Sequence, residues 1–169
     1  MKRAIAVSSA MAIALFAASI FAQGKDFSGK WTMDQEKTMA AAPAGAAAGG
    51  GGGRAGGGMG GGGGAMTIAM DAKTMKVTRT TQAGDTTMAY NLDGTDSKNM
   101  VAGRGGADPT EQVATAKWDG AKLVITTKGP NGDTTAAYSM DGASLKIETT
   151  RPGRGGGAAT TTAVFYKKG

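Results

Sequence analysis

The chain of 169 residues contains no cysteine and no histidine. The missing cysteine excludes disulfides and a thiol nucleophile, and the missing histidine removes the commonest general base and most zinc sites. Five aspartates lie directly beside glycines of predicted turns, where an aspartate favours turn formation over acid–base chemistry. These residues are Asp85, Asp93, Asp119, Asp133 and Asp141. We therefore predict no catalytic residues, no metal site and no cofactor, and we expect a protein that is not an enzyme.

Long apolar runs are equally scarce, and the one that exists lies at the N-terminus. It follows Lys2 and Arg3, continues to Phe21 and ends on small residues near Ala22, which is the layout of a secretory signal peptide. The run is too short and too rich in Ser and Ala for a comfortable membrane span, and no later segment approaches roughly 18 apolar residues. We predict that residues 1–22 are removed and that the protein is exported to the periplasm or the cell exterior without a membrane span.

The excess of positive charge is modest. The full chain carries +6, and removal of Lys2 and Arg3 leaves 17 basic against 13 acidic residues, a net charge of +4. Charges of both signs alternate along the chain, which is typical of a solvated surface and not of a nucleic-acid footprint. We expect a monomer with no nucleic-acid partner.

The 30 glycines are concentrated in a few stretches. Residues 45–65 are almost entirely Gly and Ala, so they offer no side chains whose burial could offset the entropy of ordering, and we predict a flexible loop. Residues 102–110 and 151–159 have the same character. The chain then divides into a signal peptide (1–22), a mature N-terminus with the first strand (23–44), the Gly/Ala-rich loop (45–65) and the remainder of one β domain (66–169).

Outside these stretches, apolar residues alternate with threonine at every second position, which predicts β-strands with one buried face. Asp-Gly and Asn-Gly pairs between them indicate tight hairpins. The predicted strands cover residues 29–33, 65–70, 75–80, 86–92, 98–102, 111–118, 122–127, 134–140, 144–149 and 160–168. We predict an all-β, up-and-down antiparallel meander of roughly eight to ten strands that closes into a barrel, because closure removes exposed edges, with no helix beyond a turn or two.

An internal repeat supports this topology. Residues 84–94 (GDTTMAYNLDG) and 132–142 (GDTTAAYSMDG) agree at 8 of 11 positions, which suggests one hairpin design used twice within a single sheet. Tyr90 and Tyr138 occupy equivalent positions in the two copies. Because side chains alternate along a strand, we expect both to project to the same side of the sheet.

Three segments resemble the lipocalin-like (calycin-type) group of small secreted bacterial β-barrel proteins. They are DFSGKWTMDQEKT at residues 26–38, WDGAKLVITT at 118–127 and AVFYKK at 163–168. The resemblance implies an up-and-down barrel with a central cavity, but no single activity. Lipocalins usually cover the N-terminal Trp with an Arg near the last strand, whereas this chain offers Lys167 and Lys168 there, or Arg151 and Arg154 in the preceding loop.

A barrel of this kind closes by pairing its first strand with its last. We therefore expect the indole of Trp31, which follows Gly29 on the first strand, to pack near Val164 or Tyr166. These four residues are the predicted barrel-closing set.

The strand alternation also gives a candidate ligand site. Arg79 follows Met75 and Val77 on one face, and if Arg79, Tyr90 and Tyr138 share the inner face, they supply polar handles in an apolar cavity, as in small-molecule sites. The alternative places Arg79 at a strand end with its guanidinium in water.

Two further patterns have simpler interpretations. Met66, Met70 and Met75 could ligate Cu(I) through their thioethers, but methionine alternating with threonine is also what core packing produces, and we favour packing. The arginines of the glycine-rich stretches, Arg54, Arg104, Arg151 and Arg154, are interpreted as parts of solvated linkers.

The sequence thus favours an exported lipocalin-like binding module for a small apolar or amphipathic ligand. The alternative is an envelope or extracellular interaction protein whose flexible basic loops contact anionic polymers.

Overall fold

The computed structural model describes residues 25–42, 64–81, 84–103, 107–153, 155 and 157–169. The predicted signal peptide and nearly all of the Gly/Ala-rich loop lie outside the described residues. The described part contains one short helix, α1 (Gln35–Ala40), and ten strands. The strands are β1 (Gly29–Met33), β2 (Met66–Met70), β3 (Thr74–Thr81), β4 (Gly84–Asn91), β5 (Ser97–Val101), β6 (Thr110–Asp119), β7 (Lys122–Thr127), β8 (Thr134–Asp141), β9 (Ser144–Arg151) and β10 (Thr160–Lys168).

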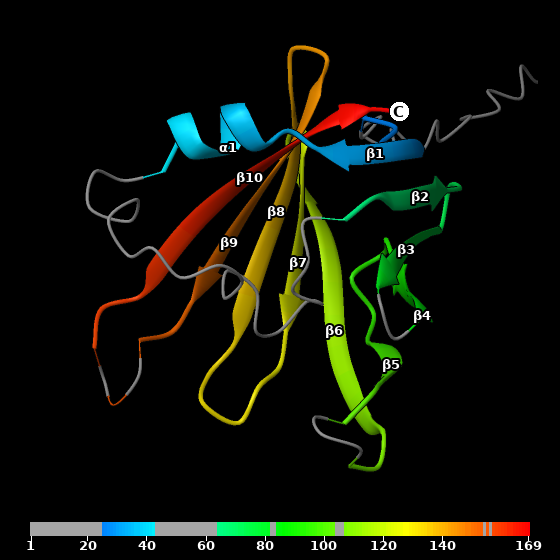
Figure 1. The fold of residues 1–169 in the computed structure, drawn as a ribbon. Helices are drawn as coiled ribbons and strands as arrows, with labels where there is room; N and C mark the ends of the chain where they lie inside the picture. Colours follow the sequence, from blue (N-terminus) through cyan, green and yellow to red (C-terminus); the bar gives the residue numbers. More distant parts are fainter. Residues whose placement is uncertain (1–24, 43–63, 82–83, 104–106, 154, 156) are drawn as a thin grey trace, which may run out of the picture.

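All ten strands form one antiparallel sheet in the order β4-β3-β2-β1-β10-β9-β8-β7-β6-β5. β1 pairs with both β2 and β10, so the first strand joins the two runs of consecutive hairpins (Figure 1). The sheet rolls until β4 approaches β5, and the result is a nearly closed barrel. The predicted all-β meander is confirmed, and α1, six residues long, stays within the expected turn or two.

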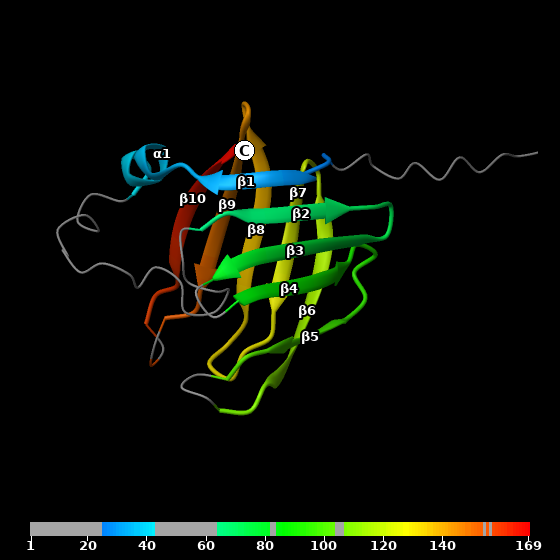
Figure 2. The same ribbon diagram turned by 45° about the vertical axis from the view of Figure 1, so that its right-hand side comes forward.

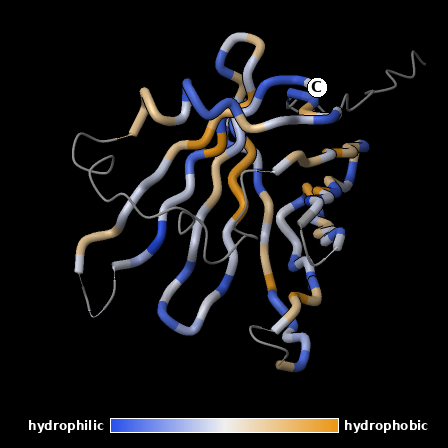
Figure 3. The backbone as a smooth tube through the Cα atoms, in the orientation of Figure 1, coloured by the Kyte–Doolittle hydropathy of each residue, from blue (hydrophilic) through white to orange (hydrophobic). Residues whose placement is uncertain are grey.

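The core lies between two parts of this sheet that run in different directions. Figure 2 shows β1–β4 crossing the direction of β6–β10, as in an orthogonal packing of sheets. The inward side chains of both parts form one buried cluster that includes Trp31, Tyr90, Leu123, Tyr138 and Leu145. Figure 3 shows that the apolar stretches of β7–β10 lie toward the end of the barrel near β1, while the other end is paler or blue.

Two of the hairpins have tight loops that begin with glycine. Asp119 stands opposite Lys122, and Asp141 stands opposite Ser144, so each hairpin has a two-residue loop that begins with glycine. Gly120 and Gly142 have φ angles of 58° and 62°. Positive φ at the first loop position is what a type II′ turn requires, and residues with a Cβ disfavour it.

The two repeat copies are not both hairpins, which corrects the expectation of one hairpin design used twice. The copy that forms β8 leads through its tight turn into the paired strand β9. The copy that forms β4 leads into a longer turn in which the Asp93 carboxylate accepts from the Thr95 backbone N–H (2.9 Å) and hydroxyl (2.7 Å). This Asx turn replaces the two-residue hairpin, and β4 and β5 are not joined by a backbone ladder.

Side chains of β5 hold this open seam instead. The Asn99 carboxamide accepts from the Ala89 N–H (2.8 Å) and donates to the Ala89 carbonyl (3.0 Å), so it imitates one residue of a neighbouring strand. The Ser97 hydroxyl accepts from the Asn91 N–H (2.8 Å). Both Ser97 and Asn99 are buried. The barrel is therefore closed at β4–β5 by two polar side chains and not by strand pairing.

Helix α1 packs on the outer face of β10. Its N-cap, Asp34, accepts from the Lys37 N–H, and the Thr38 hydroxyl accepts from the Phe165 N–H (2.9 Å). The Lys37 ammonium contacts the Asp141 carboxylate (2.7 Å) and lies 4.8 Å from the Phe165 ring centroid. No helix among the described residues is long and apolar enough to cross a membrane.

Candidate ligand-binding site

Arg79 enters the core from β3. Its backbone neighbours across the sheet are Met66 on β2 and Thr86 on β4, and the alternation along β3 puts its side chain on the same inner face as the buried Met75 and Val77. The side chain is half-buried. Arg79 therefore does not extend from a strand end into water, and the alternative interpretation of its position is wrong.

The Arg79 guanidinium hydrogen-bonds to the hydroxyls of Tyr138 on β8 and Tyr166 on β10. Burial by itself would lower the pKa of Arg79, but the two tyrosines outweigh burial and the pKa is raised. The guanidinium is therefore charged at any physiological pH. This contact joins β3 to the opposite wall of the barrel.

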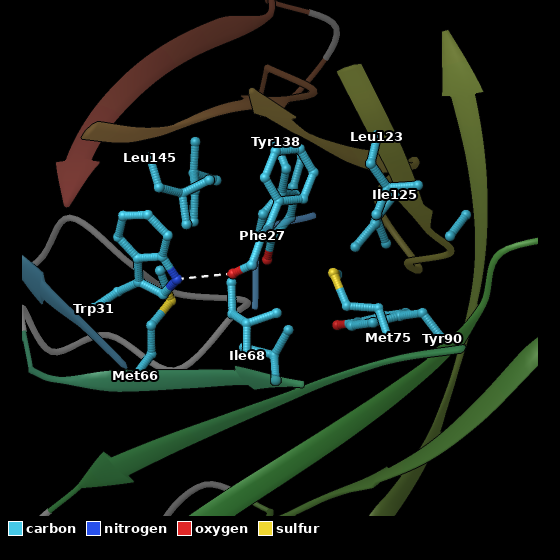
Figure 4. Packing of buried hydrophobic residues seen from close by; sticks show 14 of the residues in the cluster. Phe27, Trp31, Met66, Ile68, Met75, Tyr90, Leu123, Ile125, Tyr138 and Leu145 are labelled. Atoms are coloured by element: carbon cyan, nitrogen blue, oxygen red, sulfur yellow. Dashed lines mark hydrogen bonds between the residues drawn. The ribbon is translucent and has the colours of Figure 1, made fainter. Parts of the chain in front are cut away.

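Tyr138 and Tyr90 line the interior from opposite walls, as Figure 4 shows. Tyr138 is 1% exposed and lies between Leu123 and Ile147 across the sheet; burial raises its pKa, and Arg79 opposes this only in part. Tyr90 is 2% exposed, and burial also raises its pKa. The Tyr90 hydroxyl donates to the Met88 sulfur (3.1 Å) instead of meeting Arg79. Of the three predicted site residues, Arg79 and Tyr138 are thus in direct contact, while Tyr90 lies close enough to feel their charges but makes its hydrogen bond elsewhere.

No carboxylate balances the charge of Arg79 within the part of the chain that the structure describes. The ion pairs there all use lysines on the outer surface: Lys37–Asp141, Lys98–Glu111, Lys122–Glu148 and Lys146–Glu148. The Arg79 guanidinium has only neutral hydroxyls as hydrogen-bonding partners. A half-buried cation of this kind is a strong donor toward an anion, because burial weakens the competition from water.

Three of the four predicted barrel-closing residues, Gly29, Trp31 and Tyr166, lie on the part of β1 and β10 where the two strands pair or adjoin. Trp31 is 2% exposed, its indole N–H donates to the Phe27 carbonyl (2.9 Å; Figure 4), and the Lys168 ammonium stands 5.9 Å from its ring centroid. Lys168, and not an arginine, therefore covers the tryptophan. A Cβ on Gly29 would lie 3.0 Å from the Lys168 side chain.

Of the other two members, the strand register places only Tyr166 opposite β1. Tyr166 stands opposite Met33, and Val164 lies on β10 opposite Ile147, partly buried against the core. Sequence reasoning assigned Tyr166 to barrel closure alone and missed its contact with Arg79. The inward direction of Tyr166 could have been predicted from the sequence, because alternation along the strand puts it on the same face as Val164.

Among the described residues, the other sequence patterns form no competing site. Met66 and Met75 are fully buried in the apolar cluster, and the Met70 sulfur accepts from the Phe27 N–H (3.3 Å). No group of three or more Asp or Glu residues within the described ranges could hold a metal ion. Arg54, Arg104 and Arg154 lie outside the described residues. Arg151 is the last residue of β9 and half-buried, so its interpretation as part of a solvated linker is wrong.

A surface hollow of about 360 Å³ lies over the outer face of β7–β9. Two of its lysines already meet one carboxylate, because Lys146 lies 2.9 Å and Lys122 lies 3.8 Å from Glu148. The hollow is therefore lined by an ion-pair network on the outer surface.

The ten described strands form a nearly closed, up-and-down antiparallel β-barrel. Among solved structures, zebrafish ileal bile acid-binding protein complexed with cholic acid is similar, with a TM-score of 0.54 and 16% sequence identity over 85% of this chain and 98% of that chain. No protein-family model and no curated protein sequence matches the chain. The similarity thus concerns the fold.

Proposed function

We propose that this protein binds a small amphipathic molecule inside the barrel and that Arg79 holds its acidic head group. The observation that carries the proposal is the half-buried guanidinium with only neutral hydroxyl partners in the described chain. A carboxylate can accept two parallel N–H bonds from such a group. The apolar cluster around it suits the remainder of an amphipathic ligand. The complex of the structurally similar zebrafish protein with cholic acid supports the same class of ligand.

Tyr138 and Tyr166 position the guanidinium in this proposal. Each hydroxyl accepts from Arg79 and can donate its own proton to a bound carboxylate. Tyr90 contributes ring surface only, because its hydroxyl donates to Met88. The secretory layout of residues 1–22 supports binding in the periplasm or outside the cell.

The first prediction compares dodecanoate with its uncharged methyl ester by isothermal titration calorimetry. The wild type should bind the acid more tightly than the ester. Arg79→Met should weaken binding of the acid roughly 10- to 100-fold, the value of a hydrogen bond to a charged group, and leave binding of the ester unchanged. Tyr138→Phe should weaken acid binding to a smaller extent.

Two variants serve as controls. Lys76→Met removes the same charge from an exposed position of β3, and Tyr90→Phe removes a buried hydroxyl that does not contact Arg79. Both should bind dodecanoate like the wild type. Equal affinity of the wild type for the acid and the ester, or no binding of either, would contradict the proposal. Reduced stability of Tyr138→Phe with unchanged binding would assign the hydroxyl a purely structural role.

A further inference from the structure

The inner wall of β6–β10 changes from apolar to polar along the strands. Residues opposite one another in the register form inward rows, and the first row contains only apolar side chains and Tyr138: Trp118, Leu123, Tyr138, Ile147 and Val164. The second row mixes apolar residues with threonine: Ala116, Ile125, Ala136, Thr149 and Thr162.

The third row is mostly polar. Thr127 stands opposite both Ala114 and Thr134, and Arg151 stands opposite Thr160. Thr134 and Arg151 are neighbours because the adjacent pair in the register is Thr135 and Thr150. We call Thr127, Thr134, Arg151 and Thr160 the polar row. It crosses four consecutive strands on the inner face.

Two atoms of the polar row are buried without a hydrogen-bond partner among the described residues. They are the Thr127 hydroxyl oxygen and the Arg151 Nε. Thr127 is only 5% exposed, and its shape is nearly that of valine, which would fill the same place without a buried hydroxyl. A buried polar group without a partner destabilises the fold, so it calls for a role beyond packing.

We propose that the polar row is a second subsite of the barrel interior and that it binds a hydroxyl at the end of the ligand opposite its acidic group. This inference rests on the proposed function. A hydroxyl oxygen can accept from Arg151 Nε, and a hydroxyl can exchange a hydrogen bond with the Thr127 hydroxyl, so the polar end of a ligand offers what each atom lacks. The ligand class becomes an elongated, hydroxylated amphipathic acid.

The spacing of the two subsites sets the length of this ligand. Tyr138, which contacts Arg79, and Thr134, in the polar row, lie four residues apart on β8, which corresponds to about 13 Å along a strand. An extended acyl chain of about ten carbons covers that distance. ω-Hydroxydodecanoate therefore suits both subsites, and dodecanoate is its matched probe with one polar end.

The test titrates both probes into the wild type and into Thr127→Val. The wild type should bind the hydroxy acid about tenfold more tightly than dodecanoate, because two buried groups gain a partner. Thr127→Val should lose this preference, bind dodecanoate unchanged and melt a few degrees higher, because the unpartnered hydroxyl is gone. Higher stability combined with lost selectivity is the behaviour of a binding group and not of a structural one.

Two further variants complete the design. Thr126→Val changes the adjacent residue on the outer face of β7 and should alter neither affinity nor selectivity. Arg151→Met should reduce the preference for the hydroxy acid while retaining dodecanoate binding. If the wild type binds dodecanoate through Arg79 but gains nothing from ω-hydroxyl groups at any chain length, the polar subsite is rejected and the proposed function stands. If neither acid binds, both are rejected.

Discussion

Residues at equivalent places in a repeat can acquire different roles when they face different neighbours. Tyr90 and Tyr138 both project into the core, but only Tyr138 meets the Arg79 guanidinium, whereas the Tyr90 hydroxyl meets the Met88 sulfur. Burial raises the pKa of both phenols, because the charged phenolate would lose its hydration in the core.

Tyr90 and Tyr138 should remain protonated near pH 10, where an unperturbed tyrosine titrates. They are two of the three tyrosines in the chain, so their share of the tyrosinate absorbance should be missing there. Because the folded state binds these protons more tightly, their contribution to stability is complete below pH 10 and is lost as the pH rises further. The remaining absorbance should appear together with loss of the circular-dichroism signal of the strands.

The control for this titration is Tyr90→Phe, which should remove one phenol from the late, cooperative phase only. Titration of Tyr90 and Tyr138 near pH 10 with the fold intact would show that the buried phenols are accessible to solvent.

The inward direction of the candidate site residues could be predicted from the sequence, but their partners could not. Alternation with Met75 and Val77 places Arg79 on the inner face, and this depends only on local strand geometry. Whether its guanidinium reaches Tyr138, Tyr90 or Tyr166 depends on how two sheet regions cross. That crossing results from the twist of the sheet and is not encoded in the period of any single strand.

At the scale of elements, the strand positions could be predicted because alternation and turn glycines agree in nearly every hairpin. The seam between β4 and β5 could not. In the sequence, Ser97 and Asn99 resemble the outward polar residues of an ordinary edge strand. In the structure they are buried and supply the hydrogen bonds that a backbone ladder would otherwise make.

Asn99→Ala should therefore weaken the seam selectively. It removes two hydrogen bonds to the Ala89 backbone, and we expect a loss of about 1–3 kcal/mol in the free energy of unfolding. Hydrogen exchange should localise the effect, with faster exchange at the Ala89 amide and little change in the β8–β9 hairpin. Ser97→Ala should act in the same way on the Asn91 amide.

Lys98→Ala is the matched control, because Lys98 lies between these two residues on β5 and its side chain forms an exposed ion pair with Glu111. It should change the free energy of unfolding by less than about 1 kcal/mol. Equal protection of the Ala89 amide in Asn99→Ala and the wild type would mean that the carboxamide does not hold the seam.

At the scale of the whole molecule, β1 is the element that unites the barrel. It is the only described strand that pairs with one member of β2–β4 and with one member of β6–β10. Phe27 and Trp31 lie at this junction, and the Phe27 ring packs against Trp118 at 5.8 Å and Tyr138 at 6.3 Å between centroids. Contacts made by β1 therefore hold together two regions that also meet at the Arg79–tyrosine contact and at the β4–β5 seam.

Truncation of Trp31 should consequently destabilise the entire barrel. Trp31→Ala leaves a large cavity and frees the Phe27 carbonyl, so we expect a loss of about 3–5 kcal/mol in urea unfolding. Trp31→Phe keeps most of the buried ring surface but loses the indole hydrogen bond, and it should cost less. Met39→Ala, on the exposed face of α1 where the side chain is 73% exposed, should have almost no effect.

Because β1 joins both regions, fluorescence of Trp118 and circular dichroism should report a single transition in Trp31→Phe. Two separate transitions would show that β2–β4 and β6–β10 unfold independently and that β1 does not couple them.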